Sequence, residues 1–600
     1  MRPTLLASVL AGLVLCACQG RQRSQVTGAV AHDEPRAGPA IVVLDLSDGV
    51  PEEPPAGLLG LPSKAASFHE LVHVMRRLER EKELRAVLVR LGSARIGLAR
   101  AQEIGAMLQT LAARVPIWCH ADDLSNDTLY LVEQGCKRIW MSPAGSVDAI
   151  GLAAQTVYFH KLLAEEIGIS VDFLQVGKFK GAEEPFTRDG PSPEARASLE
   201  GTLADLRATW LDGIKRARPS LSDVAPEDGP YGVLEAKGLG LIDEAGYFDE
   251  ARDALEKEAG AVRAEVRVGA GSSSGGGDEL ADLLRTVAGE SLGSAPIALV
   301  RANGAISMDG GGGLIGETGG IVERRLVRTL LRLEQDEDVK AVVLRIDSPG
   351  GSALASDLLW HELMRIRARK PLVVSVGGMA ASGGYYLASA GTTVFAEGGS
   401  IVGSIGVVGG KLAIDHALER IGVHSETIPA RVGEPGAAAR AGYESLLMPW
   451  DDATRERVLG TMTAIYDLFV ARVAEGRGLP AERVASSAEG RIFSGGQAKA
   501  RGLVDELGGL TDAIARARTL ASLPVDARVT VAGESSGLLD ALGEEDPPEG
   551  HSPAPSALRE GLARVTPELA QLVASLAPLA STEGRHENAV CALPFALTVR

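Results

Sequence analysis

A serine flanked by small residues is the side chain best suited to covalent chemistry in this sequence. Ser382 lies in residues 376–386 (VGGMAASGGYY), which follow an apolar run typical of a strand and open a predicted helix. Small neighbours leave its hydroxyl accessible to a large substrate, and a helix N-terminus favours negative charge that develops nearby. The pattern predicts a nucleophile, although Ser382 taken alone would fit a helix N-cap equally well.

Two glycines at the end of an earlier predicted strand could bind the charge that such a nucleophile creates. Residues 347–352 read DSPGGS and directly follow an apolar run rich in β-branched residues. Without a Cβ, Gly350 and Gly351 let backbone N–H groups turn toward a ligand, as an oxyanion hole requires. Asp347 could cap this turn or orient the loop, and we assign it no chemical role.

A serine nucleophile needs a base, and lysine is a better candidate here than histidine. The chain has ten histidines, and none of them lies in a strand-end motif. Residues 175–186 (QVGKFKGAEEPF) offer Lys178 and Lys180. A lysine acts as a base only when it is neutral, which requires burial or a nearby cation. Taken alone, either lysine would more often be a solvated surface residue.

The elements that must position these residues occur twice along the chain. Residues 85–91 (RAVLVRL) correspond to residues 340–346 (KAVVLRI), and the same offset of 255 residues relates residues 116–119 to 371–374. Further matches at the same or a slightly larger offset pair residues 138–141 with 393–396 and residues 236–244 with 498–506. Strands and helices alternate in each copy, which predicts an α/β unit with parallel strands.

The two copies differ in the residues that could do chemistry. At the position of Ser382 the first copy has Asp127, and residues 92–97 (GSARIG) replace the loop with the two glycines. The second copy has no lysine in residues 432–437, where the first copy has two in its corresponding segment. The serine and the lysine therefore come from different copies, and a pseudo-symmetric pair of domains could bury the lysine between them.

Composition and repeat boundaries divide the chain into six segments. We expect a signal peptide over 1–17, a tether over 18–38, a first repeat that supplies the lysine over 39–265, a Gly/Ser linker over 266–289, a second repeat that supplies the serine over 290–530, and a flexible segment with a helix over 531–600. The helix, starting near residue 566, has one apolar face and little Lys or Arg, so we expect it to dock on the globular body.

The first eighteen residues resemble a bacterial lipoprotein leader. An apolar run too short to span a bilayer ends in residues 15–18 (LCAC), where a small residue precedes a cysteine that would be acylated. Cys18 is therefore predicted to carry a lipid, and the alternatives are a simple secretory signal or a short anchor helix. Export leaves Cys119, Cys136 and Cys591, for which a Cys119–Cys136 disulfide and buried free thiols both remain open.

The overall composition excludes several classes of protein. Of the 600 residues, 45% are hydrophobic and 23% are charged, which excludes a wholly disordered chain and a polytopic membrane protein. The net charge of −18 argues against nucleic acid as a partner, because phosphates need a basic surface. The five cysteines match no zinc-binding pattern, and we expect neither a metal nor a cofactor.

Three motifs, in order along the chain, resemble those of the long, two-repeat members of the signal peptide peptidase A (protease IV) family, peptidase family S49. They are residues 180–186 (KGAEEPF), 347–351 (DSPGG) and 377–385 (GGMAASGGY). The resemblance covers the chain from about residue 40 to residue 530. It implies an α/β fold made of two tandem domains of the Clp protease and crotonase type, in which β-β-α units form a superhelix.

The resemblance also implies roles for individual residues. Ser382 would be the nucleophile, and Lys180 rather than Lys178 would be the general base. A family serine that bonds the lysine corresponds to Ser404 in residues 402–406 (VGSIG), although Ser404 would equally fit a turn. The oxyanion donors would be the backbone N–H groups of Gly383 and of Gly350 or Gly351.

The family further implies a bowl-shaped homotetramer with the sites inside, and substrates that are cleaved signal peptides or other hydrophobic segments. Long members of the family usually have a transmembrane anchor, whereas this chain is predicted to be lipidated at Cys18. We expect it at the cell envelope, anchored to a membrane and facing the periplasm. Gln19 is not the Asp that retains lipoproteins in many inner membranes, so the choice between inner and outer membrane stays open.

Together these features predict a membrane-tethered serine endopeptidase with a Ser-Lys dyad, acting on hydrophobic peptides. One alternative is a crotonase-type acyl-thioester enzyme, which is disfavoured because export removes the chain from cytoplasmic coenzyme A. The other is a non-catalytic envelope lipoprotein scaffold, which is disfavoured because the chemical residues are divided so cleanly between the copies.

Overall fold

A computed structural model describes residues 40–53, 67–219, 221, 226–266, 295–308, 320–532 and 590–591. These residues belong to one compact unit, Ala40–Arg600. The predicted leader with Cys18, the tether, most of the linker and the helix expected near residue 566 lie outside the described residues. No helix in the described part of the chain is long and apolar enough to cross a bilayer.

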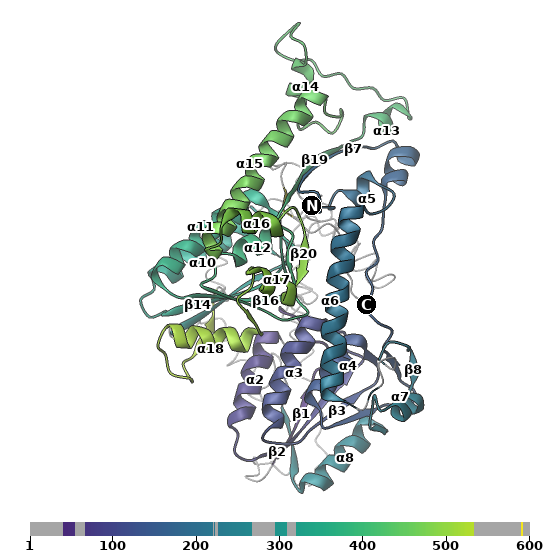
Figure 1. The fold of residues 1–600 in the computed structure, drawn as a ribbon, viewed down its shortest axis with the longest axis vertical. Coiled ribbons are helices and arrows are strands. Elements are labelled where there is room, and N and C mark those ends of the chain that lie inside the picture. Colours follow the sequence, from purple (N-terminus) through teal and green to yellow (C-terminus); the bar gives the residue numbers. More distant parts are fainter. Residues whose placement is uncertain are drawn as a thin grey trace, which may run out of the picture. The chain divides into compact units, whose positions relative to one another are not determined.

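The first copy builds a six-stranded, wholly parallel sheet. Its strands, in spatial order, are β10 (Val262–Val266), β1 (Ala40–Asp45), β2 (Leu84–Gly92), β3 (Ile117–Ala121), β5 (Arg138–Met141) and β9 (Glu244–Ala245). One face is covered by α2 (Phe68–Arg80), α3 (Leu98–Ala112) and α4 (Asn126–Gly135), and the other by α8 (Phe248–Ala259) (Figure 1). This is the parallel α/β unit that the strand-helix alternation predicted.

The second copy builds a corresponding eight-stranded sheet. Six of its strands, in spatial order, are β20 (Ile492–Ser494), β18 (Ile401–Gly403), β16 (Leu372–Ala381), β14 (Ala341–Ser348), β11 (Ile297–Asn303) and β22 (Val529–Val531). In addition, β17 (Thr393–Ala396) pairs with β16, and β21 (Glu506–Leu507) pairs with β17. All pairings are parallel except β18 with β20. Helices α10 (Glu323–Gln335), α11 (Ala353–Arg369) and α12 (Gly383–Ala388) cover one face, and α18 (Leu510–Leu520) lies on the other.

A third sheet joins the two copies. Its strand order is β13 (Ile321–Val322), β12 (Ile306–Ser307), β15 (Gly351–Ser352), β23 (Val590–Cys591), β19 (Val407–Ala413) and β7 (Ser170–Val176). The first copy contributes only β7, which pairs antiparallel with β19 over seven residues, from Val176 opposite Val407 to Ser170 opposite Ala413. The loop that follows β7 therefore starts directly beside the second copy.

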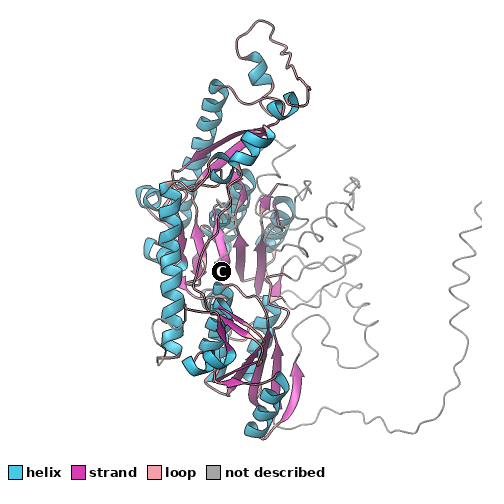
Figure 2. Ribbon diagram, turned by 90° about the vertical axis from the view of Figure 1, so that its right-hand side faces the viewer, coloured by secondary structure: helices cyan, strands magenta, loops and turns pink. Residues whose placement is uncertain are grey.

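The copies also share a hydrophobic core. One buried cluster contains Leu71 of α2 and Ile104 of α3 together with Val343 of β14 and Ile514 of α18. The long helix α6 (Pro193–Ala217) belongs to the first copy and also runs beside the second (Figures 1 and 2). Within its own copy, Trp210 Nε1 donates to Asn126 O at 2.8 Å, and toward the second copy Thr202 Oγ1 donates to Ile492 O at 3.0 Å. These contacts hold the two halves in one arrangement.

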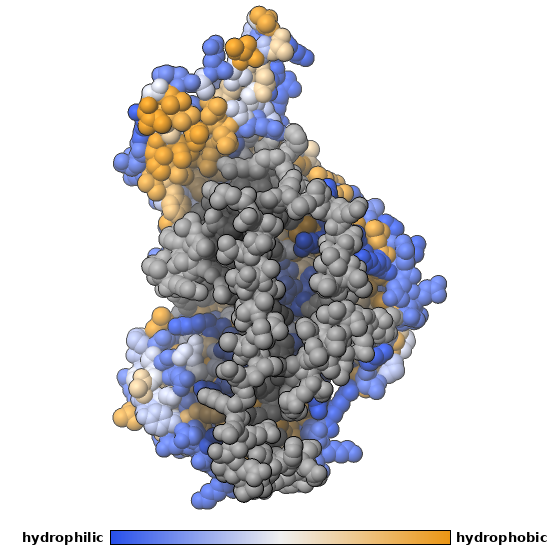
Figure 3. All heavy atoms as spheres, turned by 180° about the vertical axis from the view of Figure 1, so that it is seen from behind, coloured by the Kyte–Doolittle hydropathy of each residue, from blue (hydrophilic) through white to orange (hydrophobic). Residues whose placement is uncertain are grey.

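Exposed apolar side chains gather at one end of the molecule, around η2 (Lys161–Ile167) and α13 (Asp415–Glu419). They are Leu162 and Ile167 on η2, and Ile421 and Val423 just after α13, with exposed fractions between 42 and 73%. The view from behind shows a hydrophobic patch over this end of the molecule, at the upper left (Figure 3). A patch of this kind is typical of a surface that another molecule covers.

Candidate active site

Ser382 lies at the junction between β16 and α12, in a backbone conformation that is rare for serine. Its φ is +56° and its ψ is −116°, and a conformation this strained persists only where the surroundings hold it. Its N–H donates to Gly403 O at 2.7 Å, and its carbonyl accepts from Tyr386 N at 2.9 Å. These two bonds fix the turn that connects the strand to the helix.

The glycines after Ser382 allow helix α12 to pack against the loop that follows β14. A Cβ on Gly383 would lie 2.6 Å from Ser356 Oγ and 3.2 Å from Gly351 N. A Cβ on Gly384 would lie 2.7 Å from Ser348 O. Larger residues at these positions would push Ser382 away from the two-glycine loop.

Lys180 reaches Ser382 from the loop after β7. Its Nζ lies 2.6 Å from Ser382 Oγ, 2.9 Å from Ser404 O and 3.0 Å from Ser404 Oγ. All three side chains are fully buried, with exposed fractions of 0%. The structure thus brings together, within one chain, the three side chains that the sequence singled out. Lys178, the other lysine of the motif, points away: its side chain is 58% exposed and lies 3.6 Å from Glu489.

The backbone around Lys180 is held by a close approach to the second copy. Gly490 has a φ of +86°, and a Cβ there would lie only 2.4 Å from Lys180 N. Beside it, Phe179 N donates to Glu489 O at 2.8 Å. Only glycine permits this approach, so the residue that positions the lysine comes from the copy that carries the serine.

Ser404 is the second non-glycine residue of the site with a positive φ, at +55°. Its N–H donates to Arg491 O at 2.6 Å. It follows Gly403, whose carbonyl accepts from Ser382 N, so one short loop contacts Ser382 through its backbone and Lys180 through its side chain.

The loop with the two glycines adopts conformations that favour glycine. The φ angles are +103° at Gly350 and +155° at Gly351. Gly350 N donates to Ser348 Oγ at 3.2 Å, and Gly350 O accepts from Ile306 N at 2.9 Å. Gly351 is the residue that approaches Gly383, so the structure brings these two predicted donors together, while Gly350 N bonds within its own loop.

Asp347 connects the ends of the two strands that carry the site. Its Oδ2 accepts from Gly378 N at 3.1 Å and its Oδ1 from Met379 N at 3.2 Å. The ladder between β14 and β16 changes register at this point, between Ile346 and Ser348. Asp347 thus bonds two backbone donors of β16 where the register changes, and neither donor belongs to the loop with the two glycines.

A buried cluster of charges that the sequence did not reveal lies directly behind this loop. Arg345 of β14 has a side-chain exposure of 1% and donates to Glu52 Oε1 at 2.6 Å and to Glu103 Oε1 at 2.5 Å. Arg100 also bonds Glu52. Burial pushes the pKa of Glu52 upward, but Arg345 and Arg100 outweigh it and hold that pKa below its usual range. Three of these four residues belong to the first copy.

A second buried carboxyl lies beside the lysine. Glu183, three residues after Lys180, is 7% exposed. Burial raises its pKa to about 8, with repulsion from Glu184 adding to the effect and Lys180 opposing it. Glu183 is therefore largely neutral at pH 7, which limits the attraction that would otherwise hold Lys180 in its charged form.

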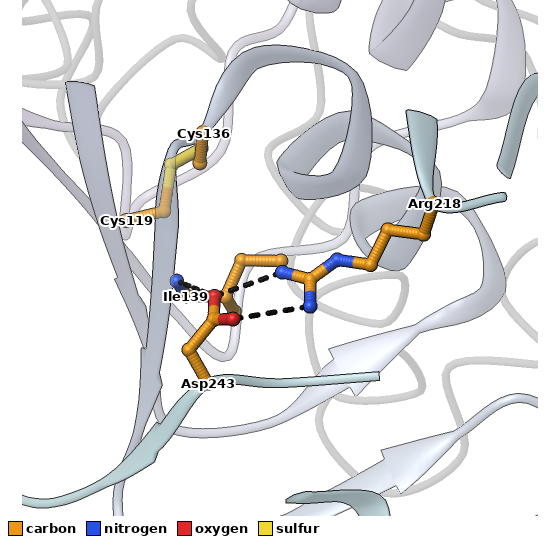
Figure 4. The surroundings of a disulfide bond; sticks show 5 residues. All are labelled: Cys119, Cys136, Ile139, Arg218 and Asp243. Carbon is orange, nitrogen blue, oxygen red and sulfur yellow. Dashed lines mark hydrogen bonds and ion pairs between the residues drawn. A yellow bond between two sulfur atoms is a disulfide. The ribbon is translucent and has the colours of Figure 1, made fainter. Parts of the chain in front are cut away.

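The structure also pairs two of the cysteines whose state the sequence left open. Cys119 of β3 and Cys136, which caps α4, form a disulfide with Cα atoms 5.8 Å apart. Next to it Asp243 accepts from Ile139 N at 2.8 Å and forms an ion pair with Arg218 (Figure 4). Within the described ranges, no group of three or more His, Cys, Asp or Glu side chains is arranged to hold a metal ion.

Two family models and several known proteins match the chain. The model of peptidase family S49 matches residues 109–262 and 365–524, and the model of Clp protease matches residues 314–397. The chain is 30% identical over 409 residues to the chloroplastic serine protease SPPA of Arabidopsis thaliana and 32% identical over 425 residues to Protease 4 of Salmonella typhi. It is 28% identical over 433 residues to Protease 4 of Haemophilus influenzae.

These alignments cover 67, 68 and 71% of this chain, in the same order. They span 58, 64 and 68% of the lengths of the three relatives. Both matches of the S49 model lie within the duplicated part of the chain, one in each copy.

Proposed function

Because the chain belongs to peptidase family S49, whose model matches both copies of its repeat, we propose that it is a serine endopeptidase with Ser382 as the nucleophile and Lys180 as the general base. The observation that carries this proposal is the 2.6 Å contact between Lys180 Nζ and Ser382 Oγ at a strained strand-helix turn. A base within hydrogen-bond reach of an otherwise weak nucleophile is the arrangement that covalent catalysis requires.

In the proposed reaction the neutral Lys180 amine removes the proton from Ser382 Oγ while the oxygen attacks the peptide carbonyl. Ser404 holds the amine in line, since its Oγ and its carbonyl oxygen both lie within 3.0 Å of Nζ. The resulting ammonium then protonates the leaving nitrogen. An acyl-enzyme remains, and a water that the same amine deprotonates releases it.

We propose that the backbone N–H groups of Gly383 and Gly351 bind the oxyanion. Of the two glycines in the loop, Gly350 already donates to Ser348 Oγ. Gly351 approaches Gly383 at the start of α12. Donors fixed in this way by the fold need no reorganisation during the reaction, and each of them typically contributes about 3 kcal/mol to transition-state binding.

The substrates that we propose are cleaved signal peptides and other extended hydrophobic segments at the cell envelope. We further propose that lipid on Cys18 tethers the chain to a membrane and that the protein faces the periplasm. The Cys119–Cys136 disulfide supports an exported location, because disulfides persist in oxidising compartments. Incorporation of radiolabelled palmitate that is lost in Cys18→Ala would test the tether, and equal labelling of both proteins would exclude it.

We also propose that the protein forms a homotetramer. The apolar patch around η2 and α13 is the described surface that supports an interface between copies. Leu162→Glu with Ile421→Glu places two charges in this patch. The mass measured by light scattering should then fall from that of a tetramer, and an unchanged mass would place the interface elsewhere.

The dyad is tested by matched substitutions assayed on an apolar fluorogenic peptide. Ser382→Ala and Lys180→Met should each remove hydrolysis while the unfolding midpoint stays close to that of the parent. Lys178→Met is the control, since this neighbouring lysine is exposed and should be dispensable. Activity of the parent should rise with pH as the amine loses its proton.

A fluorophosphonate probe separates this function from its alternatives. The adduct should map to Ser382 in the parent and be absent from Ser382→Ala. A parent that forms no adduct would favour a non-catalytic scaffold, and full hydrolysis by Lys180→Met would exclude lysine as the base.

A further inference from the structure

Three arginines, contributed by both copies, gather where helices α2 and α18 pack together. Arg76 and Arg80 lie one turn apart on α2, and Arg518 lies in the last turn of α18. Both helices contribute to one buried hydrophobic cluster (Figure 1). Arg76 Nη2 reaches across this contact and lies 3.5 Å from Thr511 O of α18. The arginine cluster (Arg76, Arg80 and Arg518) therefore spans the junction between the two copies.

Arg518 is the most deeply buried member of the arginine cluster. It is 9% exposed, and its Nη2 donates to Ala527 O at 2.8 Å. Its Nε is buried and has no hydrogen-bond partner within the described part of the chain. Burial and repulsion from Arg80 lower the pKa of Arg518, while Asp526 opposes this decrease. An unpaired buried donor on a charged group costs free energy, so a ligand that supplies an acceptor there would stabilise the folded chain.

Ion pairs do not neutralise the positive charges of the cluster. In the ranges that the structure describes, no carboxylate forms an ion pair with any of the three arginines. Burial lowers the pKa of Arg76 to about 10, and repulsion from Arg518 and Arg80 adds to the effect. Glu79 and Asp512 attract Arg76 and oppose the decrease. Because arginine stays protonated at pH 7, the cluster concentrates like charges at one place.

The dipole of α2 does not account for the cluster. Positive side chains are often found near a helix C-terminus, and Arg76 and Arg80 lie in the last two turns of α2. A different arginine already bonds the carbonyl groups at this end, since Arg114 Nη2 donates to Leu78 O and to Glu81 O, both at 2.7 Å. The charges of the cluster are therefore left for another partner.

A phosphate group is the ligand whose chemistry fits three guanidiniums best. Each guanidinium is a planar set of donors that can bind two phosphate oxygens at once. A phosphate offers more acceptor oxygens and more negative charge than a carboxylate, so it can satisfy several guanidiniums together. The chain as a whole has a net charge of −18, so the cluster is not part of a generally basic surface.

We propose that Arg76, Arg80 and Arg518 form a binding site for a phosphate group, carried either by a free phosphate compound or by the headgroup of a membrane lipid. The bound phosphate joins α2 of the first copy to α18 of the second and so stabilises the junction between the copies. The proposal does not depend on the catalytic role of Ser382, and its tests do not require peptide hydrolysis.

Calorimetric titration of inorganic phosphate into the full chain tests the site directly, with chloride used to keep the ionic strength constant. Arg76→Gln and Arg518→Gln each remove one guanidinium. Arg77→Gln is the matched control, because Arg77 is the exposed neighbour on α2 and lies outside the cluster. Phosphate should bind the parent and the control equally, and the other two variants about tenfold more weakly or worse. Equal affinity for all four proteins would overturn the proposal.

Urea unfolding gives a readout that loss of an ordinary structural contact would not give. Without phosphate, Arg76→Gln should unfold at a urea concentration no lower than the parent, because the substitution relieves repulsion within the cluster. With phosphate at about 100 times its dissociation constant, the folding equilibrium constant of the parent should rise about 100-fold, and that of Arg76→Gln much less. If Arg76→Gln is less stable than the parent by the same amount in both buffers, Arg76 is a structural residue and the proposal is wrong.

Sedimentation with lipid vesicles distinguishes the two sources of phosphate. The parent and Arg76→Gln are each mixed with vesicles of phosphatidylglycerol and with vesicles of phosphatidylcholine. Stronger retention of the parent by phosphatidylglycerol, reduced both by Arg76→Gln and by free phosphate, would support a lipid headgroup as the ligand. Binding of inorganic phosphate without such retention would support a soluble compound. A parent that binds neither phosphate nor phosphatidylglycerol through Arg76 would overturn the site.

Discussion

Replacing Arg345 with methionine tests how far the first copy supports the catalytic strands of the second. The guanidinium donates to Glu52 and Glu103 of the first copy. It also donates to Ser375 Oγ at 2.8 Å and to Val376 O at 3.3 Å on β16, the strand that leads to Ser382. Methionine has a similar length and is apolar, so Arg345→Met removes these bonds without opening a large cavity.

The expected cost follows from what the substitution leaves behind. Glu52 and Glu103 have side-chain exposures of 10% and 3%, so both carboxylates stay buried after the change. Removing one partner of a buried ion pair typically costs about 3–5 kcal/mol. Glu52 keeps Arg100, and Glu103 keeps the Leu510 N–H at 2.7 Å, so we expect a loss near the lower end, about 3 kcal/mol.

The loss is measured by urea unfolding at pH 7 in a Ser382→Ala background, which excludes self-digestion. Lys237→Met is the control, because its ion pair with Glu244 is exposed, with fractions of 43 and 44%, and should contribute less than about 1 kcal/mol. In the active background kcat should fall at least tenfold, since β16 loses two anchors just before the nucleophile. A destabilisation no larger than that of the control would refute the proposed link between the copies.

Three further predictions address the lysine, the neighbouring carboxyl and the disulfide. Gly490→Ala would place a Cβ 2.4 Å from Lys180 N, so kcat on a peptide substrate should fall about 100-fold, and a normal kcat would show that the lysine loop can shift without loss. Burial raises the pKa of Glu183 from 4.5 to about 8, so the stability of its neutral form is fully present below about pH 4.5 and is lost as the pH rises through 8. Glu183→Gln should therefore gain stability relative to the parent between pH 6 and pH 9 in urea titrations, and a constant difference would contradict the buried neutral carboxyl. Replacing Cys119 and Cys136 with alanine opens a loop with a sequence separation of 17 and should cost about 3 kcal/mol in urea unfolding, which dithiothreitol should reproduce in the parent.

The sequence was informative where the two copies could be compared. The runs at residues 85–91 and 340–346 predicted buried parallel strands, and they are β2 and β14 of the two sheets. The α/β class of two tandem domains and the S49 family are confirmed. Ser382 was singled out by its small neighbours and Lys180 by the family resemblance, and each is absent from the other copy; the structure places their side chains 2.6 Å apart.

Contacts between residues far apart in the chain could not be predicted in this way. Arg345 is a charged residue between two apolar residues of its strand. Its partners Glu52 and Glu103 lie 293 and 242 residues away, and no residue pattern near Arg345 identifies them. A charge inside an apolar strand was the available signal, since such a residue must be paired when it is buried. A Cys119–Cys136 disulfide was likewise one of two possibilities that the sequence left open. The structure places the two cysteines on neighbouring elements and joins them in a disulfide.

The duplication explains why a copy without a nucleophile would be retained. The first copy has Asp127 where the second has Ser382, yet it supplies Lys180 through β7 and two carboxylates that neutralise Arg345 behind the nucleophile strand. The second copy in turn supplies Gly490, without which the lysine loop could not approach so closely. Each copy thus contributes residues that the proposed site requires, so neither copy can form this site alone. In the described structure both residues of the proposed dyad come from one chain, at the junction of two domains that share a hydrophobic core.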